Sequence, residues 1–131
     1  MADTVTTTQV YSGPRRKVTQ ITNRSDGTGE TNVVKIDISA FTNSNGRTAD
    51  HMAIDYIEYA VWGFNFVTLA FDHTTDDVLA VLSGNGYLDY AYMGGFIDPQ
   101  SSGGTGDLVL STDGAVTDAG YNIVLHWRPK A

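Results

Sequence analysis

The residues of this chain with the clearest chemical potential lie in one short polar segment between two apolar runs. The segment reads Asp72-His73-Thr74-Thr75-Asp76-Asp77. An imidazole beside carboxylates is a set that acid–base catalysis or a divalent metal ion can use. One histidine and three aspartates in a single loop rarely converge without support from elsewhere in the chain, so the pattern favours a polar hairpin loop. The alternative is a hydrolase that uses the ionisable side chains of this segment, namely Asp72, His73, Asp76 and Asp77.

A second candidate grouping is a cluster of three tyrosines within six residues. Tyr87, Tyr90 and Tyr92 flank Asp89, and such rings can stack on sugars beside the carboxylate. More often, tyrosines in this pattern are half-buried side chains whose hydroxyls reach the surface or a partner. A carbohydrate-binding or host-adhesion module therefore remains an alternative function.

Other polar motifs predict structure instead of chemistry. Asp26 and Glu30 are close in sequence, but the segment lacks the alternating Asp/Asn positions of a calcium loop, so Asp26-Gly27 predicts a tight turn. The glycines of residues 102–106 lack the lysine and the following helix of a phosphate loop, which makes them backbone hinges. The three histidines are far apart and no nucleophile motif is present. We expect no catalytic residue, no cofactor and no metal, and therefore no enzyme.

The charge and composition of the chain exclude several classes of partner. Its 131 residues carry a net charge of −7, and three of the eight basic residues are consecutive, Arg15-Arg16-Lys17. A surface for nucleic acid needs a broader positive field, so we expect no nucleic-acid partner. No apolar run approaches the ~20 residues of a membrane helix, and the N-terminus lacks an apolar signal region, so we expect no membrane association. The absence of cysteine excludes disulfides and thiolate metal sites.

Alternating apolar and polar residues, separated by turn signals, predict about eight strands. They are expected at Arg15 to about Asn23, Thr31–Phe41, Met52–Trp62, Phe64–Asp72, Val78–Leu82, Tyr87–Tyr92, Asp107–Thr112 and Tyr121–Trp127. The expected fold is all-β, a single-domain antiparallel β-sandwich with a jelly-roll-like pattern. Val34, Ile36 and Ile38 are expected to face the core. The last two strands are expected to form a closing hairpin, with Leu108, Leu110, Ile123, Leu125 and Trp127 in the core.

The predicted contact residues fall into two groups outside this core. Residues 1–14 form an expected extended arm before a domain at 15–131, and the arm would order on a neighbouring subunit through Val5, Val10 and Tyr11. The basic triplet Arg15, Arg16 and Lys17 suits either a solvated strand entry or a dock for an acidic protein surface. A second group of aromatic residues exceeds what one small core requires and is predicted to line a subunit contact. These residues are Tyr56, Tyr59, Trp62, Phe64 and Phe66.

Several segments together resemble small virion structural proteins of tailed bacteriophages, and the likeness covers about residues 15–127. The segments are Arg15–Val18, Asp26–Glu30, Val33–Ser39, Gly94–Pro99, Thr105–Thr112 and Tyr121–Leu125. In size and sandwich-like pattern the chain is most similar to capsid decoration (cement) proteins. That resemblance implies a non-catalytic homo-oligomer, often a trimer, which binds major capsid protein subunits on the outer capsid surface of the virion. A neck, tail or fibre component is the alternative within the same group.

Overall fold

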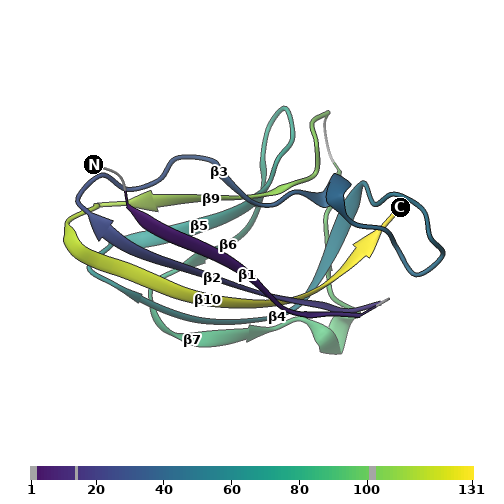
Figure 1. The fold of residues 1–131 in the computed structure, drawn as a ribbon, viewed down its shortest axis with the longest axis horizontal. Coiled ribbons are helices and arrows are strands. Elements are labelled where there is room, and N and C mark those ends of the chain that lie inside the picture. Colours follow the sequence, from purple (N-terminus) through teal and green to yellow (C-terminus); the bar gives the residue numbers. More distant parts are fainter. Residues whose placement is uncertain (1–2, 14, 101–102) are drawn as a thin grey trace.

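The protein is a β-sandwich of two antiparallel sheets packed face to face (Figure 1). The computed structural model describes residues 3–13, 15–100 and 103–131, and these contain ten strands. The predicted all-β sandwich is confirmed. The strand count exceeds the expected eight because residues 4–12 and the short segment 96–97 also pair with neighbouring strands.

The larger sheet, called sheet A, has a long central strand near the end of the described chain. Its order is β1-β2-β10-β4-β7, and β8 pairs with the start of β4. The strands are β1 Thr4–Ser12, β2 Lys17–Asp26, β4 His51–Trp62, β7 Gly84–Asp89, β8 Phe96–Ile97 and β10 Thr117–Lys130. The fourteen residues of β10 pair with β2 on one side and with β4 on the other.

The smaller sheet, called sheet B, has the order β3-β9-β5-β6. Its strands are β3 Val33–Ile36, β5 Phe66–Phe71, β6 Asp77–Leu82 and β9 Leu108–Asp113. Two single 3₁₀ turns, η1 Ile38–Ala40 and η2 Ala91–Met93, complete the described elements. Neither turn has the length and hydropathy that a membrane-crossing helix needs.

The core fills the space between the inner faces of the two sheets. Every second residue of β10 points inward and is buried, and β5 supplies the facing side chains. The large buried side chains that meet across the core from these two strands are Val67, Leu69, Phe71, Tyr121, Ile123, Leu125 and Trp127. Leu108 and Leu110 of β9 are also buried, so the core residues predicted for the last two strands are confirmed.

The predicted closing hairpin is wrong, because β9 and β10 belong to opposite sheets. β9 lies in sheet B between β3 and β5, whereas β10 lies in sheet A between β2 and β4. Both strands carry apolar residues on one face, and those faces meet across the core instead of side by side. Alternation identifies the buried face of each strand but does not identify the sheet to which the strand belongs.

The strand predicted at Thr31–Phe41 is also shorter than expected. β3 ends at Ile36 and has an irregular register between Val34 and Ile36, after which the chain forms η1. Ile36 and Ile38 are buried as predicted, but Val34 is half exposed, and Lys35, expected to face solvent, is buried. The bulge turns Lys35 inward, where its ammonium lies 2.6 Å from the Glu30 carboxylate.

Residues 4–12 of the expected N-terminal arm are an edge strand of the same chain. β1 pairs antiparallel with β2 over its whole length, and all nine of its residues are exposed. Asp3 fixes the beginning of this strand, since its carboxylate accepts hydrogen bonds from Asn23 and Ser25 of β2. The described part of the arm is therefore part of the sandwich.

Candidate functional site

The candidate site is a cluster of one histidine and two aspartates, His73, Asp77 and Asp98. It lies where two loops run side by side at the top of Figure 1. One loop joins β5 to β6, and the other joins β8 to β9. The backbone N–H of Asp72 donates to the carbonyl of Asp107 at 2.8 Å, and the N–H of Gly106 donates to the carbonyl of Asp72 at 2.9 Å. At Gly104, φ is +124°, and a Cβ there would lie 2.5 Å from the Cα of His73. Only glycine allows the two loops to approach this closely.

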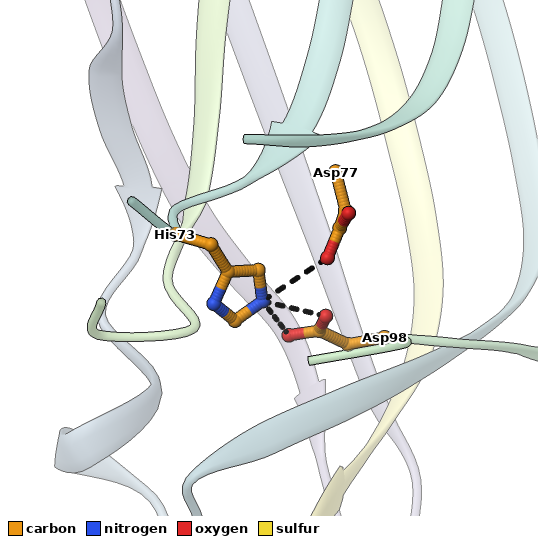
Figure 2. A group of neighbouring side chains, drawn as sticks. All are labelled: His73, Asp77 and Asp98. Carbon is orange, nitrogen blue, oxygen red and sulfur yellow. Dashed lines mark hydrogen bonds and ion pairs between the residues drawn. The ribbon is translucent and has the colours of Figure 1, made fainter. Parts of the chain in front are cut away.

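His73 and Asp98 form the centre of the site, and Asp77 completes it (Figure 2). The Nε2 atom of His73 lies 2.7 and 2.9 Å from the two carboxylate oxygens of Asp98. It lies 3.7 Å from Oδ2 of Asp77. The side chains of His73 and Asp98 are 3% and 0% exposed, and that of Asp77 is 18% exposed.

Backbone hydrogen bonds orient these groups. The N–H of His73 donates to the Asp76 carboxylate at 3.1 Å, and the N–H of Gln100 donates to the Asp98 carboxylate at 2.9 Å. Asp72 accepts a hydrogen bond from the Thr105 hydroxyl at 2.8 Å. The carboxylates of Asp72 and Asp76 thus stabilise the loop conformations, and these loops position the side chains of His73 and Asp98.

The structure brings together only part of the set predicted from the Asp72–Asp77 segment. The side chains of His73 and Asp77 converge. Asp76 instead accepts from the backbone N–H of His73, and Asp72 accepts from the hydroxyl of Thr105. The missing support comes from Asp98, 25 residues from His73 in sequence, which sequence reasoning did not select. Its one local signal was its position before Pro99, which is weak because Asp-Pro occurs in many turns. His73 and Asp98 are covered, and Asp77 is the partly exposed member of the set.

Comparisons of this chain with protein-family models, with curated proteins and with solved structures found no match.

The tyrosines predicted as a sugar-stacking platform point to separate places. Tyr87 stacks on Tyr56 of the neighbouring strand, with ring centroids 5.7 Å apart. Tyr90 packs edge-on against Phe96 at the margin of the core, and Tyr92 lies exposed on η2. The structure therefore does not assemble these three rings into one flat surface.

Glu30, the other acidic residue weighed as a calcium ligand, is committed to a buried network. Its carboxylate pairs with Lys35 at 2.6 Å and accepts hydrogen bonds from Tyr121 Oη at 2.5 Å and Asn23 Nδ2 at 2.8 Å. Asp26 instead accepts from the N–H of Thr28, as expected in a tight turn. The two carboxylates do not face a common ion.

The five aromatic residues predicted to line one subunit contact lie on different faces, so they do not form a single surface. Phe64 is buried, and Tyr59 packs partly against the core. Tyr56 and Trp62 share the outer face of sheet A, because they lie at even spacing on β4 opposite the buried positions. Phe66 starts β5, in sheet B. Strand assignment alone could not separate these faces, because both runs are apolar on both sides.

Part of the basic triplet lies beside a depression that is lined by further basic residues. Arg15, Arg128 and Lys130 line a depression of about 350 Å³ together with residues 43–45 of the loop that carries Arg47. Arg16 and Lys17 follow Arg15 in the chain, and Arg47 lies in the loop that supplies residues 43–45. These six basic residues are called the basic end. The remaining two, Arg24 and Lys35, pair with Asp118 and Glu30. A chain of net charge −7 thus carries most of its basic residues in this one group.

Proposed function

We propose that this protein is a non-enzymatic structural component that binds other protein subunits, and specifically a decoration protein on the outer capsid of a tailed phage. The exposed edge strand β1 is the observation that supports a binding role. The sequence resemblance to capsid decoration proteins supports the kind of partner.

β1 offers a ready surface for pairing with a partner chain. Its nine residues span roughly 30 Å, and in the described chain only one of its two edges pairs with another strand. Exposed edges of this length promote pairing with other chains, and proteins normally protect them. Val5, Val10 and Tyr11, the predicted anchors, lie on β1 and are 43–60% exposed.

The basic end continues this surface. Arg15 and Arg16 directly follow the β1 region and are exposed, and the depression beside Arg15 also includes Lys130. Arg128 is neutralised by Asp55, with Nε and Nη2 bonding to its carboxylate at 3.0–3.2 Å. A positive end on a chain of net charge −7 favours one orientation toward an acidic partner, because the rest of the molecule would be repelled.

Reversing two charges at this end is expected to weaken capsid binding. The double substitution Arg15→Glu and Arg16→Glu should raise the Kd for expanded empty capsids by at least about tenfold at low salt, because both changes oppose an acidic partner. Co-sedimentation of purified protein with capsids measures this. Arg24→Glu, at the far end of β2, is the matched control and should bind normally. Equal binding by both variants, or no capsid binding by the unmodified protein, would contradict the proposal.

The outer face of sheet B is where we propose that copies of this chain meet. Four apolar residues are directly aligned across its four strands, Val34, Val109, Ala70 and Val78. The central two, Val109 and Ala70, are buried, so the flanking Val34 and Val78 are the aligned residues that a second copy could contact. Val81 lies beside Val78 on the same strand, and the two are 58% and 56% exposed. The aligned positions carry no charge, so they add no repulsion between two chains of net charge −7. Uncharged apolar centres are typical of homo-oligomer contacts.

The double substitution Val78→Glu and Val81→Glu is expected to dissociate the oligomer. It places two more negative charges per copy within an apolar contact, and we expect at least a hundredfold loss of association. Sedimentation velocity of the unmodified and substituted proteins measures the change. Tyr87→Glu, on an exposed position of sheet A, is the control that should leave association intact. A monomeric unmodified protein would refute self-association at this face.

A further inference from the structure

We propose that His73, Asp77 and Asp98 form a binding site for one divalent transition-metal ion of the Zn²⁺ type. The inference is independent of the proposed capsid role. It starts from the fact that one imidazole nitrogen and two carboxylates present ligand atoms within 4.8 Å of one another.

The donor set suits such an ion. Zn²⁺ binds imidazole nitrogen and carboxylate oxygen at about 2.0–2.2 Å, commonly with four ligands in a tetrahedral arrangement. Figure 2 shows the Asp77 and Asp98 carboxylates both directed at Nε2 of His73. Three protein ligands leave a fourth position for water. The nitrogen in the set favours Zn²⁺ over Ca²⁺ and Mg²⁺, which prefer oxygen ligands throughout.

The charge of the cluster also favours a cation. Two carboxylates and one imidazole carry a net negative charge in either protonation state of His73, and Asp98 is fully buried. The Nδ1 atom of His73 points away from the carboxylates in Figure 2 and has no hydrogen-bond partner among the described residues. A divalent ion bound at Nε2 would neutralise the charge of both carboxylates, and the imidazole would then carry its single proton on Nδ1.

The positions of the ligands mean that a bound ion would link the two sheets. His73 and Asp77 flank the β5–β6 loop, and Asp98 follows β8, which pairs with β4 of sheet A. A shared ion would therefore connect a loop of sheet B to a segment attached to sheet A. Because a preformed site is absent from the unfolded chain, binding would stabilise the folded protein.

The first test is metal titration of the chelator-treated, purified protein. Calorimetry with ZnCl₂ should show one ion per chain. At free Zn²⁺ about a hundredfold above Kd, the midpoint of thermal unfolding should rise by about 5–10 °C. CaCl₂ at the same concentration should cause a much smaller shift.

Single substitutions then locate the ion. Asp77→Asn should weaken Zn²⁺ binding at least about tenfold and lose most of the thermal shift, and its partly exposed position makes a folded variant obtainable. Asp98→Asn should do the same where it folds. His51→Gln is the matched control, because it removes the histidine of the exposed His51–Asp50 pair outside the cluster. It should respond to Zn²⁺ like the unmodified protein.

The outcomes separate this site from the proposed capsid function. A Zn²⁺ response that Asp77→Asn abolishes and His51→Gln retains would establish the site. If the unmodified protein does not respond, or if Asp77→Asn responds equally, the proposal is overturned and the cluster is a buried histidine–aspartate pair only. Capsid binding is measured separately on chelated protein, so failure of either proposal leaves the other intact.

Discussion

Replacing Lys35 with methionine is expected to lower the free energy of unfolding by about 3–5 kcal/mol. The substitution removes the cation from the buried Glu30 carboxylate, whose side chain is 5% exposed. Tyr121 and Asn23 would still donate to this carboxylate, but neither carries a positive charge. Burial, and then the hydrogen bond to Glu30, raise the pKa of Tyr121, so its hydroxyl stays a donor at neutral pH. Urea unfolding followed by circular dichroism measures the loss.

Two further variants check that the loss comes from the unpaired charge. Adding Glu30→Gln to Lys35→Met removes that charge and keeps an acceptor for Tyr121, so it should recover a large part of the stability. Arg24→Ala removes the exposed ion pair with Asp118 and should change stability by less than about 1 kcal/mol. A Lys35→Met protein as stable as the Arg24→Ala protein would show that the buried pair is unimportant.

Trp127→Ala is expected to lower the free energy of unfolding by a similar amount, about 3–5 kcal/mol. Trp127 is fully buried, and its ring meets that of Phe41 edge-on with centroids 4.9 Å apart. Its indole N–H donates to the hydroxyl of Thr19 at 2.9 Å. Truncation would leave a large cavity between the sheets near the basic end and remove the donor. Urea unfolding again gives the change in free energy.

Trp62→Ala is the comparison for that substitution, because Trp62 is half exposed on the outer face of sheet A. Its indole N–H donates to the carbonyl of Asp118 at 3.1 Å, but solvent can replace that bond. We expect a clearly smaller loss than for Trp127→Ala. Equal losses would mean that burial does not determine the contribution of these two residues.

Local periodicity predicted eight of the ten strands of the described residues and most of their buried faces. Ile36, Leu125 and Trp127 were each placed in the core from alternation alone, and each is buried. The predictions failed where a neighbour far away in sequence decides the outcome. Lys35 turns inward because its ammonium pairs with the buried carboxylate of Glu30. That carboxylate also accepts a hydrogen bond from Tyr121, which is 91 residues away in sequence.

The candidate metal cluster shows the same limit. His73 and Asp77 lie in one polar segment, and their chemistry was recognised there. Asp98 joins them only because the β8–β9 loop lies against the β5–β6 loop through backbone hydrogen bonds. Pairing between loops depends on the whole sheet arrangement, which no pattern within a single strand encodes.

The central place of β10 has a consequence for how the protein folds. Every strand of sheet A that β10 joins precedes it in sequence, and Gln20 and Asn122, whose side chains bond across the β2–β10 pair, are 102 residues apart. The β1–β2 hairpin and β4 with β7 can each form early but remain separate until β10 enters between them. Such non-local pairing is entropically costly to begin and gives slow folding. Before β10 pairs with them, the exposed edges of β2 and β4 can pair with strands of other chains, which promotes aggregation.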